Sequence, residues 1–201
     1  MTLFLQIFGG GCYLLNKILF AVAETQPVKL KRSLLIAAWT VYVWGVPAWV
    51  IILAGQGNWI AVSVQVGVVP SMLFGLYNVW RRVTEPSRRA GRFVSVFTYT
   101  ALALGLGYSV VERRGITSAT QVMEMGVMVG FLVGSFLLAK RRLAGWGFFM
   151  LMNVSMASLM MVQHKPILAV QQVASLGFVV FGWALARRNA GRAVGARPEP
   201  T

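Results

Sequence analysis

The chain has 201 residues, of which 57% are hydrophobic, 12% are charged and 21 are glycine. Seven bilayer spans of about 20 residues need roughly 140 residues, so the composition is that of a chain that lies almost entirely within a membrane. It excludes an ordinary cytosolic enzyme, in which about 25% of the residues are charged. The formal net charge of +14 lies in short clusters between apolar runs rather than on one face of a folded domain, which argues against nucleic-acid binding.

Seven long apolar runs divide the chain, and each can cross a bilayer as a helix. Because the runs are continuous rather than alternating, they argue against a transmembrane β-barrel. The first run lacks the basic start and small-residue cleavage site of a signal peptide, so we expect it to be a span as well. The runs are 3–23, 33–54, 59–80, 93–111, 122–139, 146–163 and 167–186. We therefore expect an all-α integral membrane protein with seven transmembrane helices.

The basic residues between these runs predict the orientation. Fifteen Lys and Arg residues follow the first, third, fifth and seventh runs, and three follow the others. The positive-inside rule then places the N-terminus outside and the C-terminus in the cytoplasm, in the inner membrane of the cell. Residues 189–201 are basic and contain Gly and Pro, and we expect this tail to be disordered.

An internal repeat is found when the sequence is shifted by 107 residues on itself. The shift needs no gap, and it aligns the second and third runs with the sixth and seventh. The residues of the first copy that meet an identical residue are Ala37, Trp39, Gln56, Ile60, Gln65, Val66, Gly75 and Arg81. Since both copies start on the same side of the membrane, the repeats are parallel.

Parallel repeats predict a 3+1+3 arrangement of the helices. Residues 1–92 form a first three-helix bundle, 93–121 a linker helix and loop, and 122–188 a second three-helix bundle. Transporters built from such repeats hold the substrate near the bilayer midplane between the two halves.

Intramembrane amides are the first candidates for binding that substrate, because an unpartnered polar group in hydrocarbon costs free energy. Gln65 and Gln172 lie at matching depths in the two repeats, and Asn153 lies near the middle of the sixth run. An amide both donates and accepts, which suits a neutral polar ligand. The alternative role is a hydrogen bond between helices.

Aromatic residues of the second and sixth runs are further candidates. Tyr42 and Trp44 lie deep in the second run, where they either stack on a flat heteroaromatic ligand or simply pack. Trp39 and Trp146 lie nearer the cytoplasmic ends, where the alternative role is an interface anchor. The candidate substrate-binding set is Trp39, Tyr42, Trp44, Gln65, Trp146, Asn153 and Gln172.

Three residues are candidate hinges, since Pro and Gly weaken helical hydrogen bonding in mid-membrane. They are Pro47 in the second run, and Pro70 and Gly177, which the repeat aligns. Lys17 and Glu124 are the charges farthest from any loop. Either they pair or couple a proton, or Lys17 snorkels to the interface and Glu124 occupies a helix start.

Nothing in the sequence indicates catalysis, a metal or another cofactor. HExxH, GxSxG and P-loop patterns are absent. Cys12 is the sole cysteine and His164 the sole histidine, which argues against a disulfide and against a metal site. The seventh run contains no lysine for a retinal Schiff base. We therefore expect a protein that is not an enzyme and has no cofactor.

Short aromatic motifs mark the third, sixth and seventh runs. Residues 65–80 end in Phe-Gly-Leu-Tyr-Asn-Val-Trp, which resembles the Gln-then-Gly-Trp-Tyr-x-Trp ending of the third helix in the PnuC family of vitamin transporters. Trp146 followed by Asn153 resembles its sixth helix, and Gly182-Trp183 resembles the close of its seventh.

The resemblance implies a fold similar to the sugar-transporting SWEET proteins and facilitated diffusion of nicotinamide riboside or a related vitamin, trapped inside by phosphorylation. It also implies that Trp39, Gln65, Trp146, Asn153 and Gln172 line the path. A SWEET-type sugar carrier is one alternative. Another is a non-transporting scaffold or assembly protein whose basic loop, residues 81–92, binds membrane lipid or an acidic partner.

Small residues on the fifth run bear on oligomerisation. Gly126, Gly130 and Gly134 form two overlapping small-xxx-small steps. Such steps allow close packing either within the chain or between the chains of a homo-oligomer.

Overall fold

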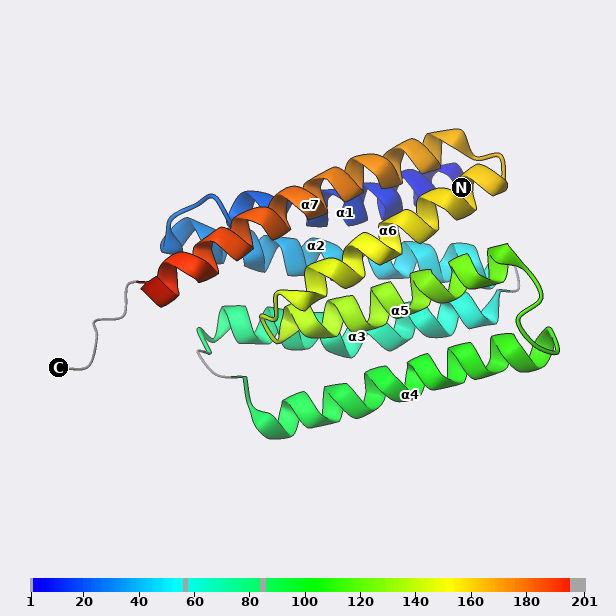
Figure 1. The fold of residues 1–201 in the computed structure, drawn as a ribbon, viewed down its shortest axis with the longest axis horizontal. Helices are drawn as coiled ribbons and strands as arrows, with labels where there is room; N and C mark the ends of the chain where they lie inside the picture. Colours follow the sequence, from blue (N-terminus) through cyan, green and yellow to red (C-terminus); the bar gives the residue numbers. More distant parts are fainter. Residues whose placement is uncertain (1, 56–57, 84–85, 196–201) are drawn as a thin grey trace.

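The computed structural model describes residues 2–55, 58–83 and 86–195. It consists of seven helices that run along a common axis (Figure 1). They are α1 Thr2–Ala23, α2 Val28–Gly55, α3 Trp59–Trp80, α4 Arg88–Glu112, α5 Ala119–Ala139, α6 Ala144–Val162 and α7 Pro166–Gly195. All seven are long and apolar enough to cross a membrane, which confirms the predicted all-α class with seven spans.

Local hydrogen bonds explain where the helices begin and end. Asn58, Ser87 and Ser118 precede α3, α4 and α5, and each side chain accepts a hydrogen bond from a backbone N–H of the first turn. After α3, α4, α5 and α6 the chain turns through one residue other than glycine that has a positive φ. These residues are Arg82, Arg114, Arg141 and His164. A basic residue at this position also suits the negative end of the helix dipole.

The C-terminal helix is longer than the apolar run predicts. α7 continues to Gly195, so residues 189–195 are helical and the expected disorder of the tail is wrong for them. Asn189 stabilises this extension, because its amide donates to the backbone oxygen of Glu24 at 3.0 Å and to the Glu24 carboxylate at 3.2 Å. The remainder of the predicted tail, 196–201, lies outside the described residues.

Six of the helices form a closed ring. Going round it, α1 packs on α2, α2 on α3, α3 on α5, α5 on α6, α6 on α7 and α7 on α1. Within the described part of the chain, α4 contacts only α3 and α5, and it lies at the edge of the molecule in Figure 1. The ring therefore has an interior toward which six helices can direct side chains.

The glycine stripe of α5 is used inside the chain. A Cβ atom at Gly126 would overlap Ser155, one at Gly130 would overlap Met152, and one at Gly134 would overlap Phe149. All three neighbours belong to α6. The small residues thus allow α5 and α6 to approach closely within one molecule.

Candidate functional site

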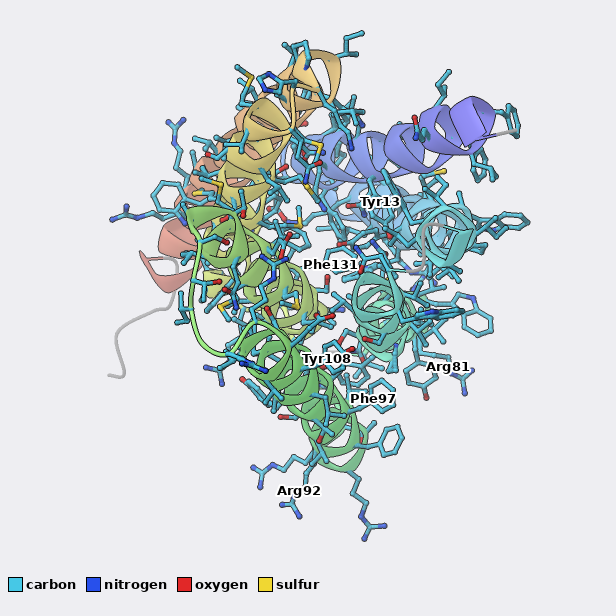
Figure 2. All side chains as sticks on the ribbon, turned by 90° about the vertical axis from the view of Figure 1, so that its right-hand side faces the viewer. Tyr13, Arg81, Arg92, Phe97, Tyr108 and Phe131 are labelled. Atoms are coloured by element: carbon cyan, nitrogen blue, oxygen red, sulfur yellow. The ribbon has the colours of Figure 1, made fainter. Side chains whose placement is uncertain are left out.

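Aromatic side chains fill the middle of the ring. The ring centroids of Tyr13 in α1 and Tyr42 in α2 are 5.2 Å apart, and both side chains lie 5.9 Å from the ring of Phe131 in α5. The view along the helices places Tyr13 and Phe131 in the interior, whereas Arg92 lies at the periphery (Figure 2). Because the backbones of α1 and α5 are not in contact, these rings bridge the interior.

The two tryptophans that the repeat aligns occupy equivalent places. Trp39 packs on Gly75 and Trp146 packs on Gly182, so closely that a Cβ at either glycine would overlap the indole. Trp39 is 2% exposed and Trp146 is 4% exposed, and the ring of Phe20 meets both of them edge to face. Their burial argues against a role as interface anchors, which face the lipid.

The same shift of 107 residues pairs a third set of side chains, Tyr42 and Phe149. Their rings lie 6.3 Å apart and nearly perpendicular. The ammonium group of Lys17 lies against both faces, 4.6 Å from the Tyr42 centroid and 3.8 Å from the Phe149 centroid. A lysine from α1 therefore lies against one ring of α2 and one ring of α6.

Two polar contacts tie this aromatic cluster to neighbouring helices. The Tyr42 hydroxyl lies 3.2 Å from Ser135 Oγ of α5, and either oxygen can donate. The Tyr13 hydroxyl donates to Gln65 Oε1 of α3 at 2.6 Å. In this structure the candidate amide of Gln65 is thus occupied by a tyrosine.

Asn153 has one side-chain atom, Oδ1, that forms no hydrogen bond. Its side chain is fully buried, and its Nδ2 donates to the Phe149 carbonyl one turn earlier at 2.7 Å. Its Oδ1 is buried without a hydrogen-bond partner. A buried acceptor left unpaired costs free energy that a ligand donor recovers.

Two candidates lie apart from this centre. Trp44 is 66% exposed on the outer surface of α2. Gln172 is half-buried, and its neighbour Gln171 donates to the Gly10 carbonyl at 2.9 Å.

The three candidate hinges differ in their surroundings. Pro47 lies inside α2 and Pro70 inside α3, while Gly177 lies in α7 with no heavy atom near its missing side chain. Their role as hinges stays a prediction.

Lys17 neither snorkels nor pairs with Glu124 in the structure, while its coupling to a proton stays a prediction. It does not snorkel, because its side chain is 2% exposed. It does not pair with Glu124, because that carboxylate accepts from Arg113 at 3.0 Å. Instead the Lys17 ammonium donates to Asn16 Oδ1 at 3.2 Å and contacts the two rings described above.

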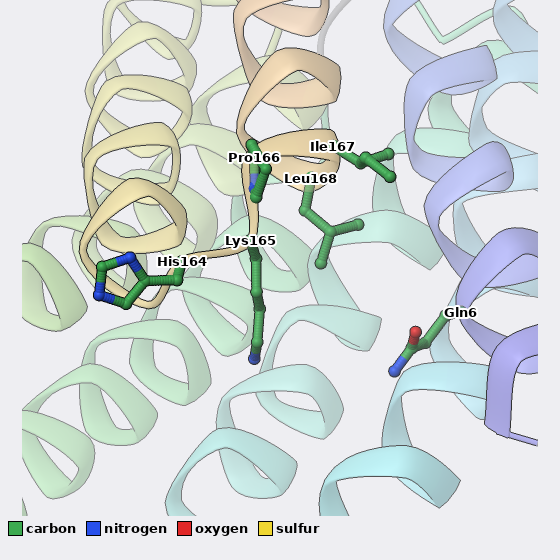
Figure 3. Close-up of a pocket in the computed structure, with 6 residues that line it drawn as sticks. All are labelled: Gln6, His164, Lys165, Pro166, Ile167 and Leu168. Atoms are coloured by element: carbon green, nitrogen blue, oxygen red, sulfur yellow. The ribbon is translucent and has the colours of Figure 1, made fainter.

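Two surface pockets lie at opposite ends of the helices. One of about 350 Å³ is lined by Gln6 of α1 and, across from it, by residues 164–168, which belong to the α6–α7 connection and the first turn of α7 (Figure 3). The other, of about 460 Å³, is basic, and its charged lining residues are Arg88, Arg92, Lys140 and Arg142. Neither pocket is lined by the central aromatic residues. Among the described residues no cluster of His, Cys, Asp or Glu could hold a metal ion.

The sequence interpretation missed several side chains of the centre, namely Tyr13, Ser135, Phe131 and Phe149. One signal was present, because the 107-residue shift aligns Phe149 with Tyr42 as it aligns the two tryptophans. This pair of aromatic residues is found when similar residues, and not only identical ones, are matched between the two segments.

Comparison with known proteins gives one match. A family model described as nicotinamide mononucleotide transporter matches residues 19–188. The matched range runs from the last turns of α1 into α7 and leaves out Tyr13 and Lys17. Neither curated proteins nor solved structures match the chain significantly.

Proposed function

Since the chain belongs to the nicotinamide mononucleotide transporter family, we propose that it carries nicotinamide riboside or a related small vitamin by facilitated diffusion through a site between two three-helix bundles. The family and the seven apolar helices make it an integral membrane transporter of the nicotinamide mononucleotide or riboside type, and not an enzyme. The family match, over residues 19–188, carries this conclusion and favours it over the sugar carrier and the scaffold.

The packing of the ring supports two equivalent bundles, α1–α3 and α5–α7. Exchanging the first three helices for the last three maps the contacts of the ring onto themselves, including α3 on α5 and α7 on α1. Trp39 on Gly75 and Trp146 on Gly182 repeat the same contact in each half. In this proposal α4 is the linker that restores the orientation of the second bundle.

The basic helix ends support an orientation. The C-terminal ends of α1, α3, α5 and α7 lie at the same end of the molecule, and most of the basic residues follow these helix ends in the sequence. We place this end in the cytoplasm and the N-terminus outside, in the inner membrane.

The central cluster supports a binding site near the midplane. The rings of Tyr42, Trp39 and Trp146 offer stacking surfaces for a nicotinamide ring. The unpaired Asn153 Oδ1 accepts from the carboxamide N–H of the ligand. Gln65 joins the site when Tyr13 releases it, and Gln172 is its counterpart in the second repeat.

Because side chains fill the centre, transport requires the two bundles to move apart. Tyr42 and Ser135 link the bundles, so this contact breaks and re-forms in each cycle. Pro47, Pro70 and Gly177 are the proposed hinges. Gly177→Ala, which meets open space, should leave folding intact and slow uptake. Uptake at the wild-type rate would remove Gly177 from the mechanism.

The placement of acidic residues supports facilitated diffusion rather than ion coupling. The five acidic residues are Glu24, Glu85, Glu112, Glu124 and Glu199, all near helix ends, in connections or in the tail. The middle of the spans thus offers no carboxylate to bind a sodium ion or to relay a proton.

The basic pocket supports a contact with membrane lipid. Arg88, Arg92 and Arg142 line it together with Lys140, at the end we place in the cytoplasm. Such pockets bind the head groups of anionic lipids. Anionic lipid retained by the purified protein should fall in Arg92→Gln, and unchanged lipid content would refute this contact. The glycine stripe of α5 is covered within the chain, so it supplies no homo-oligomer contact.

Uptake into proteoliposomes tests the proposed function. Vesicles containing the purified protein and unlabelled nicotinamide riboside should accumulate the labelled compound by exchange, without an ion gradient. Asn153→Leu should reduce the exchange, whereas Trp44→Leu, on the outer surface, should not. Exchange of glucose but of no nicotinamide compound, or no exchange at all, would overturn the proposal.

A further inference from the structure

Lys17 is a buried cation at the meeting point of the two bundles. Its ammonium group contacts the faces of Tyr42 and Phe149 and donates to Asn16 Oδ1. Asn16 is itself fixed, because its Nδ2 donates to the Ala38 carbonyl of α2 at 3.0 Å. Contacts with α1, α2 and α6 therefore fix the position of the Lys17 ammonium group.

No carboxylate balances this charge in the part of the chain that the structure describes. The two ion pairs found there, Lys31 with Glu24 and Arg113 with Glu124, both lie elsewhere. Lys17 is also the only charged residue among the buried side chains described. The aromatic faces and one amide oxygen return part of the lost hydration energy, but not the attraction of a counter-ion.

The surroundings of Lys17 are those of a ligand site rather than of a structural ion pair. Phe149, which contacts the ammonium, lies one turn from Asn153, whose Oδ1 has no partner. Phe149 thus contacts the Lys17 cation through its ring and accepts from Asn153, the residue with the unused acceptor, through its carbonyl. The rings of Phe149 and Tyr42 supply two aromatic faces beside these groups. A ligand with an anionic group, an N–H donor and an aromatic ring satisfies all of them.

We propose that Lys17 pairs with an anionic group of the transported ligand, a phosphate or a carboxylate, and thereby selects against ligands that carry only positive charge. This inference rests on the proposed function, because the ligand must enter between the bundles. The family match begins at residue 19 and assigns nothing to Lys17. The nicotinamide ring of a nucleoside is a pyridinium cation, so the ammonium repels nicotinamide riboside unless an anion accompanies the ring.

Binding of three ligands to the purified full-length protein tests this selection. Nicotinamide mononucleotide supplies a phosphate, nicotinic acid riboside supplies a carboxylate, and nicotinamide riboside supplies neither. At least one of the anionic ligands should bind about tenfold or more tighter than nicotinamide riboside. The tighter of the two identifies which anion the site takes.

Variants of Lys17 provide the second arm. Lys17→Met keeps the length of the side chain and should abolish the preference, with Lys17→Gln as an alternative should the methionine variant fail to fold. Lys17→Arg should retain the preference. Lys165→Met, which removes a lysine at the surface pocket, is the matched control and should bind like the wild type.

The outcomes separate the two proposals. Equal or tighter binding of nicotinamide riboside, unchanged in Lys17→Met, would overturn the role of Lys17 while leaving the proposed function intact. A preference for an anionic ligand that persists in Lys17→Met would also overturn it. If none of the three ligands binds the folded protein, both proposals are wrong.

Discussion

The indole of Trp146 lies directly on Gly182, so that a Cβ atom at residue 182 would stand 2.6 Å from Cζ3 of the ring. Trp39 and Gly75 make the same contact in the first half of the ring. The repeat aligns Trp39 with Trp146 and Gly75 with Gly182. The same sequence pattern thus corresponds to the same packing contact in each half. No side chain larger than that of glycine fits at these two positions, because an indole ring occupies the space beside them.

We expect Gly182→Ala to destabilise the protein by about 1 to 3 kcal/mol, because the added methyl group displaces the indole from a packed interior. Gly177→Ala in the same helix is the control, and it should be neutral or stabilise by up to about 1 kcal/mol, since the methyl group meets open space and alanine favours the helix. The free energy of unfolding in detergent is to be measured for both variants and for the wild type. Equal stability of the two would show that Trp146 does not fix residue 182.

The helices themselves were predictable because a span must be long and apolar, and seven such runs became seven helices. The ends of the helices were less predictable, since a helix can continue beyond the last residue of its apolar run. α7 reaches Gly195 although its apolar run ends at residue 186. Hydrogen bonds such as that of Asn189 to Glu24 decide such ends, and these depend on tertiary contacts.

The site was predictable only in part, because a helix that is apolar all round does not reveal which face turns inward. Tyr42 and Trp44 lie two positions apart in α2, yet one is fully buried and the other is exposed. The 107-residue shift aligns Trp39 with Trp146, and each of them packs on one of two aligned glycines. Phe131 lay outside the aligned segments, so no sequence signal marked it.

The contact between Tyr42 and Ser135 should be worth about 0.5 to 1.5 kcal/mol, the range of a typical internal hydrogen bond. A double-mutant cycle with Tyr42→Phe and Ser135→Ala isolates it, because each change removes one hydroxyl with little loss of volume. Unfolding in detergent again measures the free energies. Strictly additive effects would mean that the two hydroxyls do not interact and that this link between the bundles is absent.

Replacing Lys17 should stabilise the empty transporter. Lys17→Met removes a buried charge that lacks a counter-ion and keeps a side chain of similar length, so we expect a gain of at least about 1 kcal/mol and a higher Tm without ligand. Lys17→Arg keeps the charge and should show no such gain. A lower Tm for Lys17→Met than for the wild type would indicate that the ammonium contacts with Tyr42 and Phe149 stabilise the fold outright.

Asn153 and Asn78 offer a matched pair that separates binding from stability. Both are buried with an unpaired Oδ1, but Asn153 donates within its own helix whereas Asn78 of α3 donates to the Ala139 carbonyl of α5. Asn78→Leu should therefore cost about 1 to 2 kcal/mol of stability, because it breaks a bond between helices and leaves a carbonyl unpaired. Asn153→Leu should cost less than this.

The effect of added ligand on Tm should be impaired in Asn153→Leu and not in Asn78→Leu, the reverse of their expected order in loss of stability. A ligand that binds only the folded protein raises its Tm by mass action. We expect this rise to persist in Asn78→Leu and to be lost or strongly reduced in Asn153→Leu, because Oδ1 of Asn153 is the acceptor that a ligand N–H reaches. A full rise in Asn153→Leu would place the ligand elsewhere, while its loss in both variants would mean that the change at residue 78 spreads through α3 to the centre of the ring.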